Sequence, residues 1–185
     1  MFEGKRVRLA AVRREDLELY VRWFNDPEFT RFMAPNVLRL LSYEDEVGWY
    51  ESMRQKKDLF VFGIRTVAED KLIGNCSLNV KNWRSRMAVF GIGIGDKACW
   101  GCGYGTEAAR LLMEYGFNEL NLNRIELEVF AFNTRAIRSY EKVGFVLEGT
   151  RRQFLFRDGA YHDAHIMALL RDEWLARHKP LSDNA

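Results

Sequence analysis

The sequence is organised around one stretch, Gly93-Ile94-Gly95-Asp96-Lys97-Ala98-Cys99-Trp100-Gly101-Cys102-Gly103-Tyr104-Gly105-Thr106, which joins a predicted strand to a predicted helix. The mostly apolar residues 87–94 predict the strand, and apolar residues at helical spacing across 107–120 predict the helix. Glycines at positions 101, 103 and 105 remove side chains where a ligand would approach the backbone. Because the first N–H groups of a helix lack internal partners and can bind an anion, the stretch predicts a phosphate-binding loop. An ordinary glycine-rich loop is the alternative interpretation.

The composition is typical of one globular domain. The 185 residues, 48% hydrophobic and 29% charged, are enough for a sizeable core. A formal net charge of +2 does not indicate binding to nucleic acid or to a membrane, and no apolar run is long enough to span a bilayer. The three cysteines do not form a disulfide framework, and the start of the chain has no signal core. We therefore expect a cytoplasmic protein.

Hydrophobic spacing on either side of the stretch predicts an α/β fold. Strands are predicted at 6–10, 59–66, 72–80, 87–94, 124–130 and 145–148, with a final hairpin of 152–157 and 161–170. Helices are predicted at 15–24, 42–55, 107–120, 133–144 and 171–178, whereas 29–41 shows no clear pattern. The short polar turn between 66 and 72 predicts that strands 59–66, 72–80 and 87–94 form an antiparallel meander. We expect a single domain over residues 1–179 and a loose tail over 180–185.

The glycine-rich stretch can be compared with two known nucleotide-binding motifs. A P-loop requires Gly-Lys-Ser/Thr after its glycines, and none occurs. Residues 93–98 fit the relaxed dinucleotide fingerprint G-x-G-x-x-G/A, which belongs to a parallel βαβ unit. The predicted antiparallel meander disfavours that interpretation.

A family resemblance rests on two motifs in order. The segment Trp100-Gly101-Cys102-Gly103-Tyr104-Gly105-Thr106-Glu107-Ala108 resembles the pyrophosphate loop of the GNAT superfamily, acetyl-CoA-dependent N-acetyltransferases, and Asn133, Ala136, Tyr140, Gly144 and Phe145 match its second signature. Asn25-Asp26-Pro27, Asp158-Gly159-x-Tyr161-x-Asp163 and Glu173-Trp174 resemble the branch containing ribosomal-protein N-terminal (RimJ/RimL-like) and spermidine acetyltransferases. The likeness covers roughly residues 6–174.

The resemblance implies a GNAT fold, a mixed and mainly antiparallel sheet with helices on both faces. The strand ending at Ile94 and the one beginning at Arg124 would splay apart to hold acetyl-CoA, without a metal. The implied cofactor-binding residues are Ile92, Gly93, Ile94, Trp100, Gly101, Cys102, Gly103, Tyr104, Gly105, Thr106 and Asn133. Trp100 stands where the family usually has Gln or Arg, so a side-chain contact to phosphate is absent or replaced.

The implied reaction is direct attack of a primary amine on the thioester. Helical spacing alone puts Tyr140 on an apolar core face, but the resemblance makes it the acid that protonates the leaving thiolate. Glu44, Glu46 and Glu126 are candidates for the base. A protein N-terminus, a polyamine, an aminoglycoside and an amino sugar are candidate acceptors, and a homodimer is a candidate assembly.

Three weaker hypotheses remain. One is a non-catalytic acyl-CoA-binding module, against which Tyr140 argues. Another is a dithiol oxidoreductase using Cys99-Trp100-Gly101-Cys102, but no proline is placed to face the motif and no parallel βαβ unit is predicted around it. A zinc site from Cys99, Cys102, His162 and His165 would have to join pairs far apart in sequence.

Overall fold

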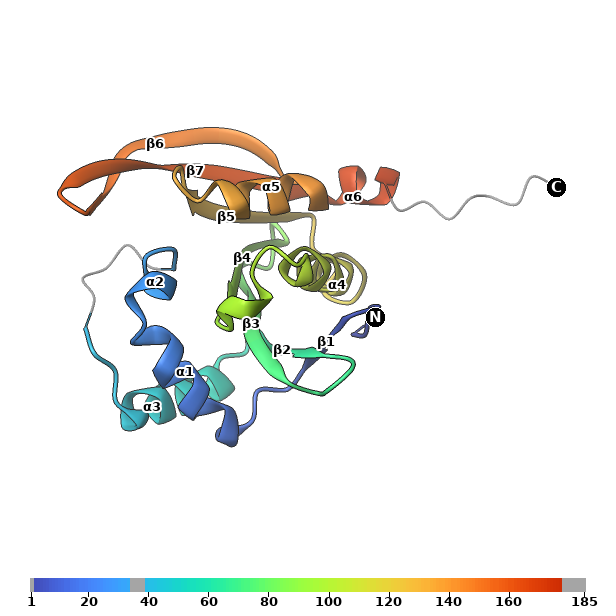
Figure 1. Ribbon diagram of the computed structural model, residues 1–185. Coiled ribbons are helices and arrows are strands. Elements are labelled where there is room, and N and C mark those ends of the chain that lie inside the picture. Colours follow the sequence, from blue (N-terminus) through green and yellow to red (C-terminus); the bar gives the residue numbers. More distant parts are fainter. Residues whose placement is uncertain (1, 34–38, 178–185) are drawn as a thin grey trace.

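The computed structural model describes residues 2–33 and 39–177 (Figure 1). Its elements, in chain order, are β1 (Val7–Ala10), α1 (Leu17–Phe24), α2 (Pro27–Thr30), α3 (Tyr43–Gln55), β2 (Leu59–Thr66), β3 (Leu72–Asn82), β4 (Met87–Ile94), α4 (Tyr104–Asn118), β5 (Arg124–Phe130), α5 (Thr134–Val143), β6 (Val146–Arg157), β7 (Ala160–Leu170) and α6 (Arg171–Arg177). The predicted tail at 180–185 lies outside the described residues.

The strands form one seven-stranded sheet in the order β1-β2-β3-β4-β5-β7-β6. The β2, β3 and β4 strands form the predicted antiparallel meander. Strand β4 also pairs in parallel with β5, but only where Met87–Val89 lies beside Arg124–Glu126. Beyond Val89 the two strands separate, as the resemblance implied. This splay splits the sheet near its middle, and a cavity opens there.

Helices cover both faces of the sheet (Figure 1), and the alternation of β2 shows why. Phe60 and Phe62 pack into a core shared with α4, whereas Leu59 and Val61 pack against α1 and α3 on the opposite face. Because successive side chains of a strand point to opposite faces, one strand supplies both cores. The expected mixed fold with two helical layers is confirmed.

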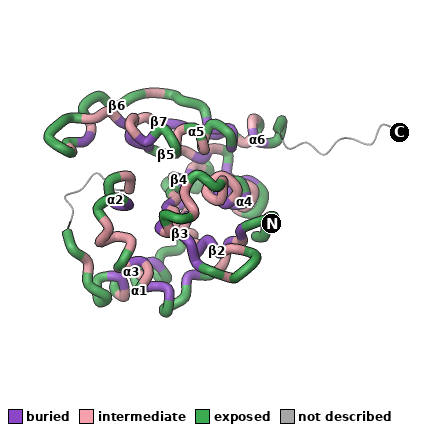
Figure 2. The backbone as a smooth tube through the Cα atoms, viewed as in Figure 1, coloured by how far each residue is buried: buried purple, intermediate pink, exposed green. Residues whose placement is uncertain are grey.

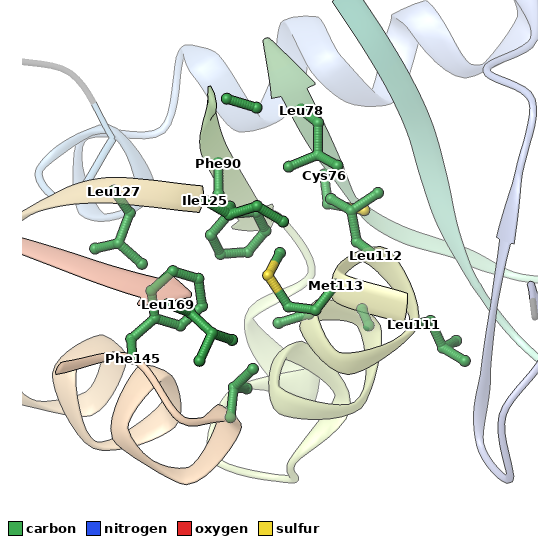
Figure 3. Close-up of a cluster of buried hydrophobic side chains, with 14 of the residues drawn as sticks. Cys76, Leu78, Phe90, Leu111, Leu112, Met113, Ile125, Leu127, Phe145 and Leu169 are labelled. Carbon is green, nitrogen blue, oxygen red and sulfur yellow. The ribbon is translucent and has the colours of Figure 1, made fainter. Parts of the chain in front are cut away.

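The larger core lies between α4, α5 and the sheet. Figure 3 shows apolar side chains from β3, β4, α4, β5 and β7 converging there, and Figure 2 shows buried segments on this side of the sheet as well as in the second core. The most enclosed side chains include Leu78, Leu112, Met113, Ile125 and Leu169. Helix α4 is therefore fixed against the sheet, and its N-terminus stays at the edge of the splay.

Several predicted boundaries are corrected. Residues 14–16 form a 3₁₀ turn before α1, and α4 begins at Tyr104 because Gly103 caps it with φ of +84°. Helix α2 was not predicted: Pro27 occupies its first turn, where its missing N–H costs no bond, and Asp26 caps it through the N–H of Glu28. The two predicted strands 145–148 and 152–157 are one strand, β6, with irregular pairing where two strands were expected.

The C-x-x-C motif lies in a βαβ unit, contrary to the prediction. Strand β4, helix α4 and strand β5 form a parallel crossover around it. The unit differs from a dinucleotide-binding fold because every other pairing between the strands of the sheet is antiparallel within the described residues.

Candidate functional site

A cavity of about 570 Å³ opens where β4 and β5 separate. Its wall comes from β4, β5, α2, α5 and the loop before α4. Ten of the residues implied by the resemblance line it: Ile92, Gly93, Ile94, Trp100, Gly101, Gly103, Gly105, Thr106, Asn133 and Tyr140. Cys102 and Tyr104 do not line it, since Cys102 is exposed and the Tyr104 ring lies under the guanidinium of Arg6.

The glycine-rich loop closes one end of the cavity. Gly101 and Gly103 have φ of +75° and +84°, a conformation that favours glycine. The side chain of Arg6 anchors the loop by donating to the carbonyl of Cys102 at 2.7 Å and to Glu107 at 3.0 Å. The loop is thereby held so that the first amides of α4, which lack helical partners, are available to an anion.

The Trp100 side chain turns inward along this loop. Its indole N–H donates to the carbonyl of Ile94 at 2.6 Å, which ties the loop to the end of β4. The guanidinium of Arg135 on α5 lies 4.0 Å from the centre of the Trp100 ring. Burial lowers the pKa of Arg135, whose side chain forms no salt bridge within the described part of the chain. A cation from α5 therefore sits over the residue that replaces the family's Gln or Arg.

Helix α5 brings further groups to the cavity. Asn133 caps it by accepting from the N–H of Ala136 at 3.2 Å. The hydroxyls of Ser139 and Thr106 lie 2.7 Å apart and join α5 to the first turn of α4. Besides Arg135, the residues Arg138 and Lys142 line the cavity. Arg135, Arg138 and Lys142 are spaced three and four residues apart, and this spacing in the sequence indicates one basic face of the helix.

Tyr140 lies in the wall between α5 and β4. Its ring makes edge contacts with Phe90 and Phe145, at centroid distances of 5.9 and 6.0 Å. Burial raises the pKa of Tyr140 to about 12, so the phenol keeps its proton at neutral pH. The hydroxyl has no hydrogen-bond partner among the described residues. Tyr140 thus presents a protonated, unbonded O–H donor to the cavity.

None of the three glutamates considered as a base lines the cavity. Glu44 lies on α3 away from it, Glu46 is buried with a pKa raised by that burial, and Glu126 accepts from Arg124. Glu128 does line it, and its carboxylate accepts from Arg151 at 2.6 Å. Sequence analysis missed Glu128, although period-two alternation puts it on the same face of β5 as Glu126.

The cysteine and histidine hypotheses find no support. Cys99 and Cys102 are free thiols, and burial raises the pKa of Cys99, which opposes the thiolate that redox chemistry needs. His162 faces the carbonyl of Arg157 and His165 faces Thr150. No group of His, Cys, Asp or Glu able to hold a metal occurs within residues 2–33 and 39–177. No helix in those ranges is long and apolar enough to cross a membrane.

Comparisons with known proteins agree with this geometry. A family model described as an acetyltransferase (GNAT) domain matches residues 6–146. The spermidine N(1)-acetyltransferase of Escherichia coli strain K12 is 31% identical over 94% of this chain and 90% of its own. An uncharacterised N-acetyltransferase, p20 of Bacillus licheniformis, is 29% identical over 92% and 96%. A crystal structure of the Vibrio cholerae spermidine N-acetyltransferase with CoA and spermine superposes with a TM-score of 0.83 at 27% identity, over 91% of this chain and 98% of that one.

Proposed function

Since the chain belongs to the GNAT acetyltransferase family and is an acetyl-CoA-dependent N-acetyltransferase, we propose which of its residues hold the acetyl donor and which take part in the transfer. The observation that carries the proposal is the cavity at the splay, with a glycine-rich helix start at one end and Tyr140 in its wall. Acetyl-CoA supplies the thioester that the acceptor amine attacks.

The fit of CoA to this cavity rests on backbone groups. Past Val89 the edge of β4 facing β5 has no strand partner in the described residues, so the backbone of Ile92 and Gly93 can bond an extended pantetheine chain. The amides at the start of α4 suit the pyrophosphate, because the glycines before them leave the backbone uncovered. Ile94 contributes less, since its carbonyl already accepts from Trp100.

Arg135 supplies the positive charge for the phosphates that the loop itself lacks. Trp100 cannot contact a phosphate as an ion, but it holds Arg135 over its ring by a cation–π contact. Arg138 and Lys142 extend the same basic face of α5 along the cavity. In this proposal the charged contact to phosphate comes from α5 and not from the loop, where this sequence departs from the family pattern.

Tyr140 acts as the general acid. A phenol with a pKa of about 12 stays protonated while the acceptor amine attacks, and its hydroxyl has no competing partner in the described residues. The amine nitrogen bonds to the carbonyl carbon of the thioester, the carbon–sulfur bond breaks, and the proton of the phenol passes to the leaving sulfur. The proton that the amine nitrogen loses then restores the phenol, directly or through solvent. The acceptor is a primary amine; a polyamine is one candidate, because two relatives are named for spermidine.

The test of the proposed function combines binding and turnover. Calorimetry should show CoA binding, and acetyl-CoA should release CoA thiol when primary amines are supplied. Arg135→Gln should weaken CoA binding by about tenfold, equivalent to about 1.4 kcal/mol. Arg84→Gln changes an exposed arginine in the turn between β3 and β4 and should leave binding unchanged. CoA binding without turnover of any amine would favour a non-catalytic acyl-CoA-binding module.

A further inference from the structure

On the side of the splay opposite α5, the cavity has a second wall. Gly93 of β4 faces α2 there: a Cβ at this position would lie 2.8 Å from the terminal methyl of Met33 and 3.1 Å from the ring of Phe29. From β5, alternation brings Glu128 and Phe130 to the same side, while Leu127 packs in the core with α5. This acceptor wall (Phe29, Phe32, Met33, Glu128 and Phe130) is where an amine would approach a thioester held along β4.

The acceptor wall has a single carboxylate. Glu128 is the one acidic side chain among the described residues that line the cavity, and it already accepts from Arg151. Acids nearby are also paired, Asp158 with Arg31 and Glu28 with Lys97. In the sequence no residue from 29 to 43 is acidic. Arg151 contacts only Oε2 of Glu128, so Oε1 can match one ammonium group, but a second or third ammonium group has no carboxylate here.

The aromatic rings of the wall do not offer an alternative binding site for the ammonium groups of a polyamine. An ammonium group can bind over an aromatic face, but three of the rings here already have a guanidinium over them, and the ring of Phe29 packs against that of Phe24. Arg135 covers Phe32 and Trp100, Arg157 covers Phe130, and Arg31 covers Phe132 just beyond the wall. A polyamine would therefore meet guanidinium groups where it needs carboxylates, whereas an apolar substituent would meet ring edges and Met33.

From these contacts, and resting on the function proposed above, we infer that the acceptor is a compact monoamine with an apolar or aromatic substituent. Its amino group contacts Glu128 and its substituent packs against Phe29, Met33 and Phe130. This preference follows from how the acids around the cavity are paired in this chain. Burying unmatched ammonium groups against apolar side chains would cost the spermidine complex more than its contacts return.

Matched acceptors test the inference. With acetyl-CoA, phenethylamine should have a kcat/KM at least about tenfold above that of spermidine. Glu128→Gln should raise the KM for phenethylamine and leave CoA binding unchanged. Met33→Glu adds a carboxylate to the wall and should raise the kcat/KM for spermidine, whereas Met33→Gln, of similar size and uncharged, should not. A spermidine kcat/KM equal to or above that of phenethylamine would overturn the inference.

Amine binding separates this inference from the proposed function. Calorimetry on the protein saturated with CoA measures phenethylamine and spermidine without any turnover. Tighter binding of phenethylamine supports the inference even if no amine releases CoA from acetyl-CoA, a result that would count only against the proposed function. Tighter binding of spermidine refutes the inference whether or not the protein turns over.

Discussion

Replacing Tyr140 with phenylalanine should nearly abolish turnover without disturbing the fold. The change removes one hydroxyl and keeps the ring, which contacts Phe90 and Phe145. Because the hydroxyl has no hydrogen-bond partner among the described residues, its loss breaks no bond and creates no cavity in the core. The free energy of unfolding should change by less than about 1 kcal/mol, and Tm by no more than a few degrees.

The expected kinetic effect follows from the acid role. A positioned proton donor contributes about 10²- to 10⁴-fold to the rate, so kcat of Tyr140→Phe should fall by that factor, or about 2.7 to 5.5 kcal/mol. CoA affinity should be unchanged, since the loop glycines and Arg135 are untouched. The assay follows CoA release with a thiol reagent for both proteins, using the best amine found, and calorimetry supplies the CoA affinity.

The pH profile gives an independent check on the same residue. Because burial raises the pKa of Tyr140 to about 12, the phenol stays protonated through pH 10, and kcat should show no alkaline loss from this group below that pH. A tyrosine with an unshifted pKa would be deprotonated in half of the molecules near pH 10. Turnover by Tyr140→Phe at the rate of the parent protein would refute the acid role and leave solvent or another residue as the donor.

Three further variants probe the loop, the cysteines and the fold. Gly103→Val should weaken CoA binding by at least about tenfold in calorimetry and lower stability by about 1–2 kcal/mol in urea, because φ is +84° there. Cys99→Ser with Cys102→Ser should keep the parent's acetyl-transfer rate and zinc content; a lost rate would point to a thiol function. Asp16→Ala leaves the buried Arg65 without its ion-pair partner and should cost about 3–5 kcal/mol in denaturant unfolding, and a smaller loss would mean that water reaches the pair.

The glycine prediction has a matched control. Gly149 lies in β6 without a positive φ, and a Cβ added there would have open space around it, so Gly149→Ala should change neither CoA affinity nor stability appreciably. Unchanged CoA affinity in a folded Gly103→Val protein would place the pyrophosphate away from the loop.

Local signals were enough for most elements of the fold. Strands β2, β4 and β5 are confirmed over their predicted ranges because each run depends on neighbours within a few residues. Helix α2 escaped prediction because Pro27 suggests a helix end as readily as a first turn. The continuity of β6 was missed because pairing with β7, not local sequence, carries the strand across its irregular register.

The sequence alone also determined the family and the elements that build the site, since the glycines before α4 and the spacing from Asn133 to Tyr140 are carried by contiguous segments. The sequence could not show which charged side chains contact one another or which of them line the cavity. That Arg135 lies over Trp100, that Arg6 anchors the loop and that Glu128 rather than Glu126 lines the cavity depend on contacts between segments distant in the chain. Only tertiary structure decides these, because a side chain's electrostatic partner is set by distance and burial in the folded molecule, which residue spacing does not encode.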